Sequence, residues 1–78
     1  MSPDVLEKRL LDFFSDAQVE VIDLTGGQDH YAVTVVSSDF EGHKLVEQHR
    51  LVYDCVRPEL ENGEIHALKV TTKKPKKG

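Results

Sequence analysis

Cysteine is almost absent from this chain of 78 residues, in which Cys55 is the single thiol. One cysteine cannot form an internal disulfide, and a chain this short buries only about 60% of the surface that it exposes when unfolded. No apolar stretch approaches the roughly 20 residues that cross a bilayer, and no apolar leader follows Met1. We therefore expect one domain of modest stability in a reducing intracellular compartment, with no membrane-spanning role. The cytoplasm is the first expectation, and plastid and mitochondrion are the alternatives.

Basic residues are also scarce outside the C-terminus. Four of the ten lysines and arginines stand in residues 73–78, which leaves six basic against fourteen acidic side chains in residues 1–72, a net charge of −8. An acidic body repels phosphate backbones, so nucleic-acid affinity has to come from the tail or from a local basic strip. We expect one domain over residues 1–72 and a basic, disordered tail over residues 73–78.

The first half of the chain predicts a helix and a hairpin. Ser2, Pro3 and Asp4 form a helix-start signal that predicts a helix over residues 3–15. The side chains expected on its core-facing stripe are Leu6, Leu10, Phe13 and Phe14. Segments 19–24 and 31–36 are rich in β-branched residues and flank a polar loop that contains two glycines. They predict two antiparallel strands.

The second half predicts a longer helix, a short helix and a strand. A helical pattern runs from Lys44 and ends at or before Arg57, because Pro58 follows. The stripe expected toward the core consists of Leu45, His49, Val52 and Val56. Residues 59–61 predict a short helical turn that ends at Asn62-Gly63, and residues 65–71 predict the last strand. This order predicts an α+β sandwich, with helices packed on a three-stranded sheet.

Four histidines and one cysteine are the candidate ligands for a transition metal. His49 and Cys55 are expected to be structural parts of the second helix, and His43 to be exposed without a special role. His30 stands where the glycine-bearing loop meets the second strand, and His66 stands near the start of the last strand. The two become neighbours if these strand ends meet, although each also fits an ordinary loop or sheet histidine.

Several segments resemble the signature segments of the BolA family. They are Val35–Gly42 (VVSSDFEG), Gln48–Tyr53 (QHRLVY) and Glu64–Leu68 (EIHAL), in the order that the family uses. The resemblance covers about residues 3–72. It implies a class II K-homology-like fold, partnership with a monothiol glutaredoxin, and a role in iron-sulfur cluster maturation, cluster transfer or iron sensing. Family members commonly continue into a final helix, which we do not expect from the lysine-rich residues 72–78.

The resemblance also implies how a metal is held. The family shares a 2Fe-2S cluster with glutaredoxin and glutathione, and binds it with the histidine of the Ile-His-Ala segment and with a histidine or cysteine of the hairpin loop. His66 matches the first, and His30 takes the second role because Gln28 is a poor ligand. Imidazole binds metal only when deprotonated, so the complex should loosen as the pH falls below about 6.5.

The implied partners are a monothiol glutaredoxin and apo-proteins that receive the cluster, and no cofactor is expected in the isolated chain. Residues beside the two histidines are expected to contact the partner: Asp29, Tyr31, Ile65 and Ala67.

Two other classes of function are alternatives for this sequence. A nucleic-acid-binding regulator would use the K-homology-like topology, with Arg50, Lys69 and the lysine tail as a basic strip. The Gly-x-x-Gly loop of nucleic-acid-binding K-homology domains is absent from the sequence. A hydrolase would use Ser37, His30 and Asp29, but no Gly-x-Ser-x-Gly motif surrounds the serine. We therefore expect no enzyme, and a cluster-binding partner protein ahead of a regulator.

Overall fold

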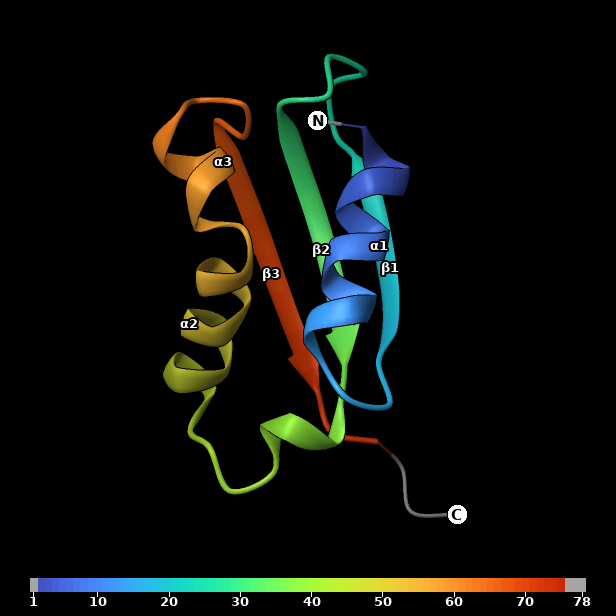
Figure 1. Cartoon of the computed structure of the whole chain (residues 1–78), viewed down its shortest axis with the longest axis vertical. Helices are drawn as coiled ribbons and strands as arrows, with labels where there is room; N and C mark the ends of the chain where they lie inside the picture. Colours follow the sequence, from blue (N-terminus) through green and yellow to red (C-terminus); the bar gives the residue numbers. More distant parts are fainter. Residues whose placement is uncertain (1, 76–78) are drawn as a thin grey trace.

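The computed structural model describes residues 2–75. Its elements follow the predicted order of helix, strand, strand, helix, short helix and strand (Figure 1). Their bounds are α1 Pro3–Phe13, β1 Gln18–Asp23, β2 His30–Val36, α2 Leu45–Cys55, α3 Arg57–Glu61 and β3 Ala67–Lys73, with a 3-10 turn, η1, at Ser38–Phe40. The α+β prediction is confirmed. Within residues 2–75 no helix is both long and apolar enough to span a bilayer.

The three strands form one mixed sheet in which β2 is central. β1 and β2 are antiparallel, with Gln18 opposite Val36 and Asp23 opposite Tyr31, as a hairpin requires. β2 and β3 are parallel, with His30 opposite Ala67. The start of β2 and the start of β3 therefore lie at the same end of the sheet, at the top of Figure 1.

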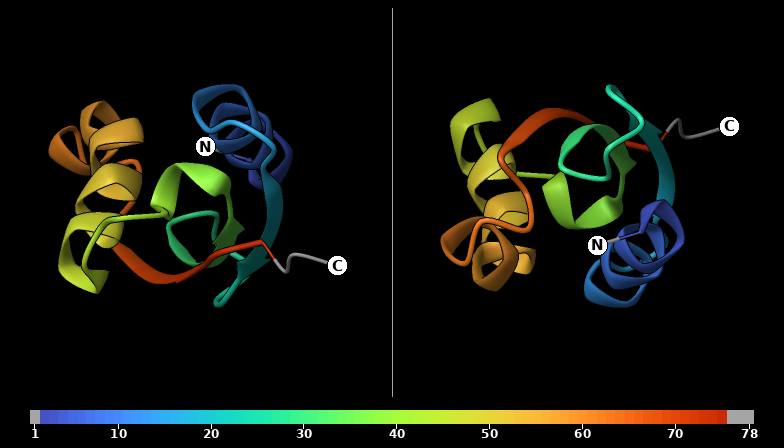
Figure 2. Two further views of the ribbon diagram at one scale, coloured as in Figure 1. Left: turned by 90° about the horizontal axis from the view of Figure 1, so that it is seen from below. Right: turned by 90° about the horizontal axis from the view of Figure 1, so that it is seen from above.

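The helices cover one face of this sheet and leave the other face open (Figure 2). α1 packs against β1, and α2 packs against β3. Because side chains alternate along a strand, Tyr31, Val33 and Val35 of β2 all point under the helices and are buried. Each such side chain contributes about 1.5–3 kcal/mol to folding, so the central strand is the most firmly held element of the sheet.

α1 begins where the sequence predicts. The Ser2 hydroxyl accepts a hydrogen bond from the Val5 N–H at 3.3 Å, and Pro3 occupies the first turn, where its missing N–H leaves no unpaired partner. The apolar side chains Leu6 and Leu10 are buried. The predicted start of the helix and the predicted burial of Leu6 and Leu10 are thus confirmed.

The end of α1 differs from the prediction, because the helix stops at Phe13 rather than near residue 15. Phe13 is half exposed, so its expected place in the core was wrong. Phe14 lies just past the helix in an extended conformation and turns into the core. Its ring packs on that of Phe40, with 5.1 Å between the centroids. The change of backbone direction after Phe13 therefore buries Phe14 and leaves Phe13 half exposed, which helical periodicity does not predict.

The buried stripe of α2 also differs from the prediction. Leu45, expected in the core, is 61% exposed, and His49 is only partly buried. The buried side chains of this helix are Gln48, Val52 and Cys55. Val52 and Val56 are thus buried as predicted, whereas the stripe begins at the polar residue Gln48 instead of Leu45.

Gln48 can lie inside because its amide is hydrogen-bonded. Its Nε2 donates to the carbonyl oxygen of His43 at 2.9 Å, and the Thr72 hydroxyl donates to its Oε1 at 2.6 Å. A buried amide that keeps its partners avoids most of the desolvation cost. These bonds join α2 to β3 and to the loop before α2, so the QHR segment of the sequence begins with a structural residue.

The break between α2 and α3 follows the prediction. Pro58 stands in the first turn of α3, and the Asn62 N–H bonds the Pro58 carbonyl before Gly63 turns the chain with φ +85°. Glu59 is buried and accepts a hydrogen bond from Arg9 Nη1 at 2.5 Å. This ion pair ties α3 to α1 across the helical layer.

β3 begins later than predicted, at Ala67 instead of residue 65. Ile65 lies in the segment that leads into the strand, and its side chain is part of the core. The strand runs to Lys73, whose carbonyl accepts a hydrogen bond from the Ser37 N–H at 3.2 Å. Lys73 therefore belongs to the sheet and not to the predicted tail. Lys74 and Pro75 lie outside any helix. Residues 76–78 of the predicted tail lie outside the described residues.

Candidate metal centre

His30 and His66 come together at one end of the sheet. His30 is the first residue of β2, and His66 directly precedes β3, whose first residue pairs with His30 in the parallel ladder. The two ring centroids are 5.8 Å apart, with the ring planes nearly perpendicular. Two imidazoles from distant segments are thus close enough to share one small ligand.

The loop before His30 is organised by the carboxylate of Asp23. It accepts hydrogen bonds from the N–H groups of Thr25 at 3.2 Å, Gly26 at 2.9 Å and Gln28 at 3.1 Å. Gly26 takes φ +77°, which only glycine adopts without cost. The Leu24 N–H then closes the hairpin on the His30 carbonyl at 2.8 Å. The loop presents its last residues, 29 and 30, toward β3.

Asp29 lies between the two histidines. Its Oδ1 is 2.9 Å from His30 Nδ1, and its Oδ2 is 3.4 Å from His66 Nδ1. The His30 ring and a hydrogen bond from the Thr25 hydroxyl lower the pKa of the Asp29 carboxyl, and His66 lowers it a little further. The Asp29 carbonyl also accepts the N–H groups of His66 at 2.7 Å and Ala67 at 3.3 Å. Asp29 thus joins the hairpin loop to the start of β3 through both its backbone and its side chain.

The Nδ1 atom of His30 is buried and has no hydrogen-bond partner among the described residues, even though Asp29 Oδ1 is close to it. The His30 side chain as a whole is 40% exposed and that of His66 is 59% exposed. An unsatisfied ring nitrogen beside a second accessible imidazole suits a metal site that is open to solvent on one side. Two imidazoles are also the nitrogen ligands of Rieske-type 2Fe-2S centres, so the residues present fit that group.

The remaining ligand candidates stay away from this site. His43 is exposed, with its Nδ1 3.8 Å from Glu47 at the start of α2. Cys55 is only 6% exposed, its sulfur lies 3.6 Å from the Arg9 carbonyl oxygen, and burial raises the pKa of its thiol to about 11. The prediction that Cys55 is a structural thiol is confirmed by this burial.

Two of the residues expected to contact a partner are buried. Tyr31 and Ile65 lie in the core with almost no exposed surface, so a direct contact of their side chains with a partner is not expected from this structure. They position the site instead, because each directly adjoins one of the two histidines in sequence. Asp29 is partly buried and Ala67 is exposed, so both still border the histidine pair.

A hydrolase would need Ser37 beside His30 and Asp29, and only the latter two are in contact. Ser37 follows the far end of β2, so at about 3.3 Å per residue it lies roughly 20 Å from His30. Its hydroxyl is buried and donates to the Ser15 carbonyl at 2.6 Å. It also accepts the Asp39 N–H at 3.1 Å. Ser37 fastens β2 to the turn that follows α1.

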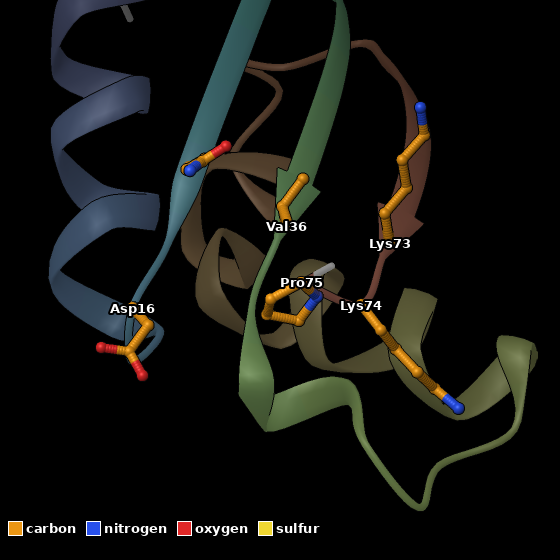
Figure 3. Close-up of a pocket in the computed structure, with 6 residues that line it drawn as sticks. Asp16, Val36, Lys73, Lys74 and Pro75 are labelled. Carbon is orange, nitrogen blue, oxygen red and sulfur yellow. The ribbon is translucent and has the colours of Figure 1, made fainter. Parts of the chain in front are cut away.

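A pocket also lies at this far end of the sheet, between the turn after α1 and the end of β3 (Figure 3). Its lining includes Asp16, Val36, Lys73 and Lys74. No histidine or cysteine lines it. The metal-ligand candidates therefore occupy an exposed rim, where a second protein can reach them, rather than a cavity.

The basic residues that are candidates for nucleic-acid binding lie in different layers of the fold. Lys69 stands on the open face of β3, where it is exposed opposite Ala32, and Arg50 is exposed on α2. Glu20 of β1 is exposed on the same open face as Lys69. This face therefore carries both signs of charge.

Comparison with known proteins agrees with this architecture. The family model described as "BolA-like protein" matches residues 12–77. The chain is 35% identical to an uncharacterized Rickettsia prowazekii protein, RP812, over 92% of each chain. It is 40% identical to the Vibrio cholerae protein named DNA-binding transcriptional regulator BolA, over 92% of this chain and 74% of that one. The chain belongs to the BolA-like family.

Solved structures show the same fold. BolA1 from Arabidopsis thaliana superposes with a TM-score of 0.85 and 31% identity, over 97% of this chain and 94% of that one. The BolA domain of SufE1 from the same plant superposes with a TM-score of 0.84 and 32% identity, over 94% and 91%. Some curated relatives are much longer, and the chain spans only 31% of the chloroplast protein BOLA1 of Arabidopsis.

Proposed function

We propose that this chain is a non-enzymatic partner of a monothiol glutaredoxin and that it holds one side of a shared 2Fe-2S cluster through His30 and His66. The observation that carries the proposal is the meeting of these two partly exposed imidazoles at one end of the sheet. Membership in the BolA-like family supports it. The role is cluster maturation, transfer to apo-proteins, or iron sensing.

The chain needs a partner for this role, because its own ligands are insufficient. Cys55 is buried in the core, and the site offers nitrogen and carboxylate oxygen but no sulfur. Iron-sulfur clusters are held largely by thiolates, which a glutaredoxin cysteine and glutathione supply. When bound, such a cluster supplies one-electron redox chemistry, and neutral imidazole ligands raise its reduction potential relative to thiolates.

The residues of this chain have separate tasks in the proposal. His30 and His66 bind the cluster, and Asp29 and Ala67 border the surface that the partner covers. The loop organised by Asp23 holds His30 in place. Thiolate ligands of the cluster stay reduced in a reducing intracellular compartment. We propose the cytoplasm as the simplest location for a chain with one buried thiol.

The test mixes the purified chain with a monothiol glutaredoxin that carries its cluster and glutathione, and follows visible circular dichroism. The wild-type chain should change the spectrum of the cluster, and His30→Ala and His66→Ala should each abolish or alter that change. His43→Ala is the matched control, because His43 is an exposed histidine beside a carboxylate but far from the rim. A wild-type chain that leaves the spectrum unchanged, or a His43→Ala effect as large as the other two, would refute the proposal.

A second candidate function is nucleic-acid binding, which is favoured by the similarity to the Vibrio cholerae DNA-binding transcriptional regulator BolA. In this chain Lys69 and Lys73 stand on the open face of the sheet, and Arg50 lies on α2. If these residues contact phosphates, the logarithm of the binding constant should fall with the logarithm of salt concentration by about 0.9 per contact on duplex DNA. Fluorescence anisotropy with duplex and single strands measures this slope for the wild type and for Lys69→Ala and Arg50→Ala. No binding at low salt eliminates this function.

A further inference from the structure

Asp29 adds a third ligand atom to the two histidines. Ligand atoms of Asp29, His30 and His66 all lie within 4.8 Å of one another. The proposed cluster uses only the two imidazoles, so the carboxylate has no role there as a ligand. We propose that, in the free chain, Asp29, His30 and His66 together bind a single divalent transition-metal ion of the Zn²⁺ or Fe²⁺ type.

The distances agree with a shared ion. Zinc binds histidine nitrogen and carboxylate oxygen at about 2.0–2.2 Å, so two ligands of one ion lie about 2.9 Å apart in octahedral and about 3.4 Å apart in tetrahedral coordination. The separations of Asp29 oxygens from His30 Nδ1 and His66 Nδ1 are 2.9 Å and 3.4 Å. The third separation, between the two imidazoles, is at most 4.8 Å, and it has to shorten by side-chain rotation when an ion binds.

The local hydrogen bonding leaves one ring nitrogen of the site without a partner. His30 Nδ1 is buried and lacks a hydrogen bond, even though Asp29 Oδ1 is at hydrogen-bonding distance. The two atoms are in electrostatic contact, but their geometry falls short of a well-formed hydrogen bond. An ion between them satisfies the ring nitrogen and the carboxylate at the same time.

The three residues are held before any metal binds. The Thr25 hydroxyl donates to Asp29 Oδ1 at 3.0 Å, and the His66 N–H donates to the Asp29 carbonyl at 2.7 Å. Because little ordering is left to binding, the loss of conformational entropy on metal binding is small.

The donor set decides which class of ion fits. Two imidazoles and one carboxylate suit first-row divalent ions from Fe²⁺ to Zn²⁺, whereas Mg²⁺ and Ca²⁺ prefer oxygen ligands throughout. With three protein ligands on an exposed rim, the remaining positions stay open to water or to a ligand from another molecule. Where the proposed function also holds, such an ion occupies the same histidines and competes with the cluster. The metal site itself does not depend on that function.

The experiment titrates the metal-free chain with Co²⁺, follows the visible absorption of bound cobalt, and then displaces it with Zn²⁺. The wild type should bind one equivalent. Asp29→Asn should weaken binding by at least about tenfold, and His30→Ala and His66→Ala should weaken it at least as much. His43→Ala should bind as the wild type does. Far-UV circular dichroism confirms that each variant is folded.

Three outcomes overturn the proposal. One is an absence of cobalt binding at millimolar concentration. Another is wild-type affinity in Asp29→Asn, which would exclude the carboxylate as a ligand. The third is a His43→Ala variant that loses binding, which would move the site to α2. The failure of this proposal is distinguishable from failure of the cluster proposal, because Asp29→Asn retains both histidines and can be tested with the glutaredoxin complex separately.

Discussion

Burial of Cys55 predicts that the single thiol of this protein is nearly unreactive in the folded state. Its pKa rises from 9.0 to about 11, chiefly through loss of hydration, and only 6% of the residue is exposed. At neutral pH this lowers the fraction of thiolate about 100-fold relative to an unperturbed thiol with the same starting value. Labelling with a disulfide reagent at pH 7.5 should therefore be at least about 100 times slower in the native protein than in urea.

The same shift predicts how stability depends on pH. Because the folded pKa lies above the unfolded one, the stability that comes from the protonated thiol is complete below pH 9 and is lost as the pH rises toward 11. The loss reaches about 2 kcal/mol by pH 10.5.

Urea unfolding of the wild type and of Cys55→Ala at pH 8 and pH 10.5 measures this loss. Tyrosine and lysine titration is common to both chains, so only the difference between their unfolding free energies should change, by about 2 kcal/mol. A constant difference, or native labelling within tenfold of the unfolded rate, would refute the argument and make Cys55 available as a metal ligand.

Three further predictions follow from single contacts. Gln48→Ala should lower the unfolding free energy by about 2–3 kcal/mol in urea titrations, because it leaves the Thr72 hydroxyl and a backbone carbonyl without their partner, and Thr72→Val should cost less. Gly42 has φ +82° and open space around it, so Gly42→Ala should cost about 1 kcal/mol through backbone strain alone, and Gly42→Asn less than that. The Asp29 carboxyl should titrate below its ordinary pKa in carbon-detected NMR, and its pKa should move back toward the ordinary value in His30→Ala. The stability that the ionised carboxylate contributes is therefore present near neutral pH and disappears as the pH falls through the lowered pKa. An Asp29 pKa that is identical in both chains would contradict the geometry.

Local signals in the sequence were enough for the order of the elements and for the candidate histidines. The capping hydroxyl of Ser2, the hairpin loop and Pro58 mark three element boundaries through backbone chemistry that acts within a few residues. His30 and His66 were predicted as neighbours on the assumption that the ends of two strands meet, and the parallel pairing of β2 with β3 confirms this.

Features that depend on contacts between distant residues could not be predicted in the same way. Leu45 was predicted in the core but is exposed, whereas Gln48, absent from the predicted stripe, is buried by its tertiary hydrogen bonds. The position of the Asp29 carboxylate between two imidazoles depends on a loop that is folded around Asp23. Hydrophobic periodicity contains no information about either arrangement.

The parallel pairing of β2 with β3 makes the histidine pair a late product of folding. A chain folded only as far as the β1–β2 hairpin offers one imidazole, because His66 arrives only after the whole helical crossover has packed and β3 has docked. Long-range strand pairing of this kind is slow compared with hairpin formation. In the proposed function, binding of the cluster by both histidines therefore requires the complete domain, and a chain that lacks the docked β3 should fail to form the shared complex.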